Sequence, residues 1–208
     1  MLKLLLAALC FLLTNGDASD EKKEKTISLY NGYDLTNWVV TDFGTQGSVK
    51  VENGTLILNM GEGATGITWN GDFEFPKMNY EVSLDAMRVD GNDFFCGMTF
   101  PVNNDYLTLI VGGWSGTVVG LSSLDGFDAS ENETGLSMSF QKKRWYDIRL
   151  RVAADSVKVW IDNKKVIDCY TADRDLSIRS EVLLSRPFGL ASWYTKAALK
   201  DIRLKLLD

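Results

Sequence analysis

The chain has 208 residues, which suits one sizeable domain, and its 45% hydrophobic and 24% charged residues exclude an intrinsically disordered protein. The formal net charge of -6 disfavours nucleic acid and anionic membrane surfaces as partners, because both repel an acidic protein. The chain also contains no histidine. This absence excludes catalytic triads with a histidine base, histidine-ligated zinc and any other imidazole base.

Residues 1–18 have the pattern of a signal peptide. Lys3 precedes an uncharged apolar stretch of about ten residues, which is too short to span a bilayer well. Gly16 and Ala18 place small residues at the -3 and -1 positions, so cleavage is expected after Ala18. The protein is therefore expected to be secreted or periplasmic, with no transmembrane span in the mature chain. A competing interpretation is a lipoprotein anchor at Cys10.

The remaining sequence divides into a charged linker at residues 19–25 and a single domain at residues 26–208. Short apolar runs alternate with turn residues in this domain, and helical periodicity is almost missing, which predicts an all-β sandwich. The expected strands are residues 27–31, 38–41, 48–52, 55–60, 65–69, 79–89, 93–101, 105–112, 116–122, 137–140, 144–153, 156–162, 164–170, 182–185, 188–194 and 197–206. A short helical patch is expected near residues 172–180.

Two hairpins give the strongest evidence for strands. Asn53-Gly54 lies between two strand-like runs, and this pair tolerates the positive φ of a type I′ turn. In residues 146–152 the apolar residues alternate with Asp147, Arg149 and Arg151, so one face of that strand is apolar and the other charged. Residues 157–161 continue the alternation after a turn, which indicates a second strand paired with the first.

These segments resemble a known family. "LYNGYDLTNW" at residues 29–38, "VENGTLIL" at 51–58, "WYDIRLRV" at 145–152 and "VKVWIDNKKVID" at 157–168 resemble the 3-keto-disaccharide hydrolase domain of the concanavalin A-like lectin/glucanase superfamily. The resemblance implies an all-β, concanavalin-like jelly-roll β-sandwich of two antiparallel sheets. It also implies a secreted bacterial protein that processes sugars, with carbohydrate as the partner and 3-keto-glycosides as possible substrates.

The sequence departs from this family at three places. The family shows a strand that ends in arginine, followed by a Tyr-Glu-x-Gln stretch, whereas residues 92–100 hold an apolar or neutral residue in place of the arginine. Residues 106–109 read Tyr-Leu-Thr-Leu. Trp193 or Tyr194 stands where a histidine is often found near the penultimate strand. The departures fall at positions linked to catalysis and leave the fold motifs intact.

Four residues are the candidates for a sugar site on the concave sheet or its rim. Asp93 opens an expected inner strand and is the candidate catalytic base. Thr99 lies six residues further on the same face and offers a hydroxyl. Trp114, between glycines in a turn, and Trp193 are the candidate platforms for stacking an apolar sugar face. In the alternative interpretation, Trp114 folds back to cap the core.

Three functions remain open. The first is a hydrolase of glycosidic bonds, in which one carboxylate removes the acidic C2 proton of a 3-keto sugar and elimination is followed by addition of water. Glu81 and Asp85 are some 13 Å apart at ~3.3 Å per residue of strand, so they do not form a close carboxylate pair by themselves. A partner would have to come from a neighbouring strand, for example Asp93 or Asp105. The second is a non-catalytic glycan-binding module, and the third is a structural sandwich without a small ligand.

No cofactor or metal is predicted. The acidic segment at residues 124–133 is oxygen-rich, but its spacing does not match a calcium loop, so a solvated loop is the other interpretation. Cys96 and Cys169 lie in apolar runs and are expected as buried free thiols, with a disulfide as the alternative that export permits. The protein is expected to be a monomer.

Overall fold

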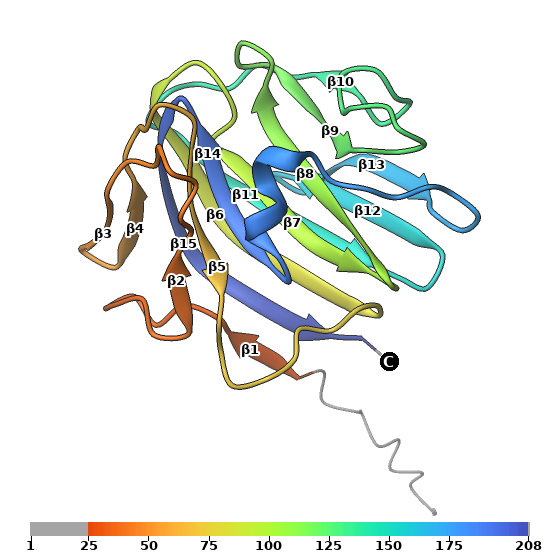
Figure 1. Cartoon of the computed structure of the whole chain (residues 1–208), viewed down its shortest axis with the longest axis horizontal. Helices are drawn as coiled ribbons and strands as arrows, with labels where there is room; N and C mark the ends of the chain where they lie inside the picture. Colours follow the sequence, from red (N-terminus) through yellow and green to blue (C-terminus); the bar gives the residue numbers. More distant parts are fainter. Residues whose placement is uncertain (1–24, 208) are drawn as a thin grey trace, which may run out of the picture.

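The computed structural model describes residues 25–207 and consists of two antiparallel sheets packed face to face (Figure 1). This architecture confirms the predicted all-β jelly-roll sandwich. Sheet A has the order β13-β12-β11-β6-β15-β4-β3, with β1 beside β15, and sheet B has the order β10-β9-β8-β7-β14-β5-β2. Hairpins of consecutive strands, such as β11-β12-β13 and β7-β8-β9, are combined with pairs from distant parts of the chain, such as β6-β15 and β14-β5, as is typical of jelly rolls.

The strands of sheet A are β1 (Thr26–Ser28), β3 (Val49–Glu52), β4 (Thr55–Leu58), β6 (Tyr80–Gly91), β11 (Trp145–Val152), β12 (Ser156–Ile161), β13 (Lys164–Tyr170) and β15 (Thr195–Leu206). Those of sheet B are β2 (Trp38–Val40), β5 (Ala64–Trp69), β7 (Cys96–Val102), β8 (Asp105–Gly113), β9 (Val118–Ser122), β10 (Leu136–Ser137) and β14 (Gly189–Trp193). Among residues 25–207, the helical element is η1, a 3₁₀ turn at Ser180–Ser185.

The segment before β14 differs from the expectation. Residues 182–185 were expected as a strand and residues 172–180 as a helical patch, but the helix is η1 and Leu176 forms an isolated β-bridge. Val182 and Ser185 are buried while the residues between them are exposed. A spacing of three places both buried side chains on one side of a 3₁₀ turn, and a run this short does not distinguish a turn of helix from a strand.

The core lies between the sheets and is rich in aromatic side chains. The rings of Phe75 and Phe188 stack with centroids 4.3 Å apart and an interplanar angle of 9°. Trp38 is buried, and its Nε1 donates a hydrogen bond to the carbonyl of Leu29 at 2.7 Å. Cys96 is buried as a free thiol at this core, as is Cys169, and burial raises the pKa of Cys96 to about 12.

The two sheets differ on their outer faces. In sheet A, β11 and β12 alternate between buried and more exposed residues, so their outer face is in contact with solvent. In sheet B, every residue of β5 and β7 is buried, because further segments cover its outer face. One of these is η1, which lies in front of sheet B (Figure 1) and accepts a hydrogen bond from Thr68 Oγ1 at the Leu184 carbonyl, 2.9 Å away.

A second covering segment is the loop after β9. A Cβ at Gly120 would lie 2.8 Å from the carbonyl oxygen of Ala129, so the glycine allows the loop to pack directly on β9. Between residues 25 and 207, no helix is long and apolar enough to cross a membrane.

Replacing Phe188 tests how far the stacked aromatic core supports the sandwich. Phe188→Ala is expected to lower the free energy of unfolding by about 3–5 kcal/mol, because the ring is fully buried and its removal leaves a cavity. Phe127→Ala is the control, since Phe127 is 57% exposed, and it is expected to cost less than about 0.5 kcal/mol. Urea unfolding monitored by circular dichroism measures the free energy of unfolding of both variants. Equal losses in the two variants would contradict the role of Phe188 in the core.

Candidate functional site

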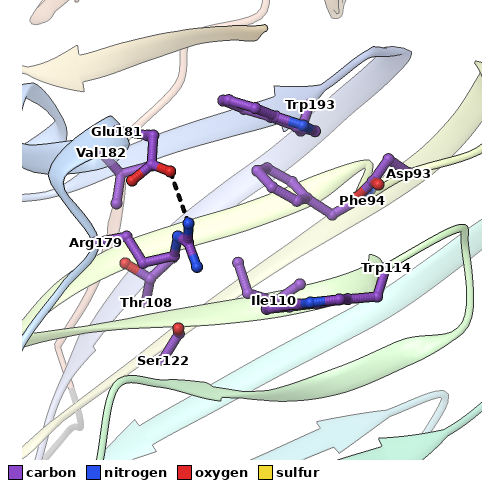
Figure 2. A pocket seen from close by; sticks show the side chains of 10 residues that line it. All are labelled: Asp93, Phe94, Thr108, Ile110, Trp114, Ser122, Arg179, Glu181, Val182 and Trp193. Atoms are coloured by element: carbon purple, nitrogen blue, oxygen red, sulfur yellow. Dashed lines mark hydrogen bonds and ion pairs between the residues drawn. The ribbon is translucent and has the colours of Figure 1, made fainter. Parts of the chain in front are cut away.

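A pocket of about 200 Å³ opens on the outer face of sheet B, between the segments that cover it. This volume is below the ~300–1,000 Å³ typical of drug-sized ligands and suits a small molecule such as one sugar ring. The pocket is lined by Asp93, Phe94, Thr108, Ile110, Trp114, Ser122, Arg179, Glu181, Val182 and Trp193 (Figure 2).

The floor of the pocket follows from strand alternation. Leu107 and Leu109 of β8 point into the core, so Thr108 and Ile110 project from the outer face of the sheet. Ser122 at the end of β9 continues this floor beside Thr108, to which it is paired across the two strands. Strand periodicity therefore supplies the floor of the pocket, whereas its walls come from turns and from η1.

One end of the pocket is aromatic. Trp193 at the end of β14 stacks on Phe94, with ring centroids 6.3 Å apart and an interplanar angle of 25°. Trp114 stands on the turn after β8 and is 39% exposed, so it does not cap the core. Flat, partly exposed rings are suited to contact with the C–H face of a sugar.

Asp93 lies at this aromatic end, in the turn that leads into β7. Its Oδ1 accepts a hydrogen bond from the backbone N–H of Phe94 at 2.8 Å, and its Oδ2 accepts one from the N–H of Ser115 at 3.5 Å. Its own N–H donates to Thr195 Oγ1 at 3.0 Å. The carboxylate is thus oriented by two neighbouring segments of backbone while it lines the pocket.

The opposite end of the pocket is an ion-pair network. Arg179 donates from Nη2 to Glu181 at 2.7 Å and from Nη1 to Asp128. Asp128 Oδ1 also accepts hydrogen bonds at 2.9 Å from the hydroxyls of Ser122 and Ser123. Figure 2 shows Arg179 and Glu181 facing each other across from Asp93, with Ile110 between the two ends.

The network fixes the charge of Glu181. The hydrogen bond from Arg179 lowers the pKa of Glu181 to about 2, with further contributions from the backbone and from Ser180. Glu181 is therefore ionised near neutral pH and accepts hydrogen bonds, but it has no proton to donate. Asp147, whose pKa is raised mainly by desolvation and then by Asp85, lies on β11 in the other sheet.

Three of the four residues predicted from the sequence line this pocket: Asp93, Trp114 and Trp193. Thr99 does not line it. Thr99 is 1% exposed, and its hydroxyl shares a hydrogen bond of 3.0 Å with the hydroxyl of Thr108. Thr108, and not Thr99, lines the pocket. Thr99 also pairs with Gly189, over which Ser185 of η1 packs, so η1 covers this part of the sheet.

Arg179, Glu181 and Ser122 were not foreseen. Arg179 and Glu181 fall in the segment whose local structure was predicted incorrectly, and no motif marks them. Their partner Asp128 belongs to the acidic segment at residues 124–133, which was interpreted as a solvated loop or a calcium loop.

The acidic segment is paired with arginines. Asp125 and Glu133 both accept hydrogen bonds from Arg174 at 2.6 Å. The pKa of Asp125 is lowered first by the backbone N–H of Asp175 and then by Arg174, and the pKa of Glu133 is lowered mainly by Arg174. Within residues 25–207, no group of three or more acidic, cysteine or histidine side chains is arranged to hold a metal ion. The carboxylates of this segment stabilise the loop that covers β9.

Comparison with known proteins gives a family and a fold. Residues 25–205 match the family model described as the 3-keto-alpha-glucoside-1,2-lyase-like domain. No curated protein matches the sequence.

Several solved structures share the sandwich at low identity. A putative glycosyl hydrolase from Parabacteroides distasonis has a TM-score of 0.56 and 13% identity, over 88% of this chain and 94% of that one. The carbohydrate-binding module CBM66 from Bacillus subtilis has a TM-score of 0.53 and 13% identity, over 83% and 97%. The β-glucanase of Bacillus licheniformis has a TM-score of 0.57 and 9% identity, over 89% and 98%.

The pairing of Glu181 predicts a specific acid sensitivity. Because its folded pKa of about 2 lies below the ordinary value of 4.5, its ion pair stabilises the fold above about pH 4.5, and this contribution is lost as the pH falls through about 2. Glu181→Gln is expected to lower the urea midpoint near pH 7 and to approach the wild type near pH 2. Glu131→Gln, in an exposed position, serves as control. If the urea midpoint of Glu181→Gln lies below that of the wild type by the same amount at every pH, the pairing is contradicted.

Proposed function

Because the chain belongs to the 3-keto-alpha-glucoside-1,2-lyase-like domain family, we propose that it is a carbohydrate-active enzyme that cleaves glycosidic bonds of 3-keto-glycosides in the pocket on sheet B. The observation that carries this proposal is the position of Asp93, a carboxylate held by backbone N–H groups at the aromatic end of a pocket sized for a sugar ring. The fold is one that glycosyl hydrolases and carbohydrate-binding modules share.

The chemistry requires one base. A carbonyl at C3 makes the neighbouring C2–H acidic, and Asp93 takes that proton as the electron pair moves into the C1–C2 bond. The C1–O bond to the leaving group then breaks, and the leaving oxygen takes up the proton that Asp93 received, which restores the base. Addition of water to the resulting double bond completes a net hydrolysis. General base catalysis by one positioned side chain contributes about 10²–10⁴-fold.

The other carboxylate of the pocket supports this route over a two-carboxylate glycosidase. Such an enzyme needs a carboxylic acid that is protonated at working pH. Glu181 is ionised and bonded to Arg179, so it is suited to accept hydrogen bonds from sugar hydroxyls. Trp193 and Trp114 supply the apolar contact for the ring.

The second candidate function is a non-catalytic glycan-binding module. The observation that favours it is that both pocket carboxylates already accept hydrogen bonds within the protein, as expected of groups that present fixed acceptors to a ligand. In this function Asp93 binds a hydroxyl group and removes no proton.

Two variants separate these functions. Asp93→Asn is expected to lower turnover of a 3-keto-glycoside by at least about 100-fold and to change the dissociation constant by less than about threefold. Trp193→Ala is expected to weaken binding by about 1–3 kcal/mol, by analogy with nucleic-acid bases that stack on aromatic side chains. Trp160→Ala, a tryptophan on the outer face of sheet A, is the matched control and should behave as wild type.

Calorimetry and chromatographic assay of the products measure both properties on a panel of glycosides and 3-keto-glycosides. Wild-type turnover in Asp93→Asn would overturn the assignment of the base. Binding without turnover by the wild type would establish the glycan-binding function. Absence of both would overturn the proposed site.

We also propose that the chain is exported and acts as a monomer. The leader at residues 1–18 lies outside the described residues, so the support is the sequence pattern of Lys3 and Ala18. Expression in a bacterial host with an intact secretion system should give a mature N-terminus at Ser19 by mass spectrometry. An intact Met1 or a lipid on Cys10 would contradict this cleavage site.

A further inference from the structure

A charged residue of sheet A extends through the end of the core to the pocket side of the molecule. Arg88 is in β6, on the face that carries Leu84 and Ala86 into the core, and it is 5% exposed. Its guanidinium carbon lies 5.2 Å from the ring centre of Phe95 and 5.9 Å from that of Phe140. Burial of a charged group is costly unless hydrogen bonds compensate for it.

The side chain of Arg88 donates its hydrogen bonds to one turn. Its Nη2 donates to the carbonyl of Gly112 at 3.0 Å and to that of Gly116 at 2.9 Å. These two carbonyls lie on either side of Trp114, one of the aromatic residues that line the pocket. The same guanidinium group therefore binds both ends of the five-residue segment at 112–116.

The backbone of this segment is unusual. Trp114 and Ser115 have φ values of +46° and +69°, in the left-handed region that non-glycine residues rarely adopt. Gly112 has a φ of +81°, and a Cβ there would lie 2.3 Å from Arg88 Nη2. Glycine at position 112 thus permits the close approach of Arg88, and the two hydrogen bonds hold a conformation that the residues themselves disfavour.

The turn also contacts Asp93. The N–H of Ser115 donates to Asp93 Oδ2, so the position of the turn affects the orientation of the carboxylate. The charges of Arg88 and Asp93 attract each other, which partly offsets the lowering of the Arg88 pKa by burial.

We infer that Arg88 is a positioning residue for the sugar site, because it holds the 112–116 turn that presents Trp114 and orients Asp93 from a place outside the pocket. This inference rests on the proposed function of the pocket. Arg88 is not among the residues that line the pocket, so its effect on a ligand passes through the turn.

The first test needs no ligand. Hydrogen–deuterium exchange is measured for Arg88→Met, which keeps the length and the apolar stem of the side chain but removes the donors. Amides of residues 115–117 are expected to exchange at least about tenfold faster, since bonds to a charged donor are among the stronger ones. Arg88→Lys should restore part of the protection, and Arg203→Met, at an exposed arginine of β15, should match the wild type. Unchanged exchange at residues 115–117 would overturn the inference.

The second test measures coupling to Trp114. With a sugar identified by the panel above, Arg88→Met is expected to weaken binding about tenfold in the wild-type background and by less than about twofold in a Trp114→Ala background. An equal loss of sugar affinity in both backgrounds would overturn the inference, because Arg88→Met would then act by a general destabilisation of the protein. If the wild type binds no sugar, the proposed function fails, while the exchange experiment still decides whether Arg88 holds the turn.

Discussion

The burial of the central strands of sheet B on both faces is the constraint on which the rest of the structure depends. A sheet that packs on the core with one face and on η1 and the 123–134 loop with the other leaves little room for solvent on its central strands. Polar groups between these layers must then bond to one another, as Thr99 does with Thr108. The pocket exists because the covering layers do not meet: the space between η1 and the 112–116 turn is where the floor of β8 remains open.

The charged groups at one end of the pocket belong to the segments that cover sheet B. The covering segments are held by arginine–carboxylate pairs, Arg174 with Asp125 and Glu133, and Arg179 with Asp128 and Glu181. The second set reaches the pocket wall, so the same bonds that attach η1 to the loop set the ionisation of a lining residue. At this end one network both stabilises the fold and fixes a lining carboxylate, whereas at the Asp93 end backbone N–H groups orient the carboxylate.

The sequence was sufficient for the sandwich because its information is local and periodic. Alternation in residues 146–152 and the Asn53-Gly54 turn each specify a strand or a hairpin without reference to distant residues. The pocket was predicted in part. Trp114 was found from its flanking glycines, and Asp93 and Trp193 from their places at the ends of strands. Arg179 and Glu181 were missed because a short apolar run gives no clear period, and Thr99 was misplaced because strand alternation selects a face but does not say what covers that face.

The floor of the pocket belongs to sheet B, whereas η1 and residues 114–117, which form part of its walls, lie outside the strand ladders. Part of the shape of the pocket is therefore set by segments that take no part in strand pairing. Changes in the six residues of η1 or in residues 114–117 would reshape the pocket while every strand pairing stayed in register. A fold divided in this way can acquire new ligands through small segments, which is consistent with the variety of carbohydrate-related proteins that share its architecture at identities of 9–13%.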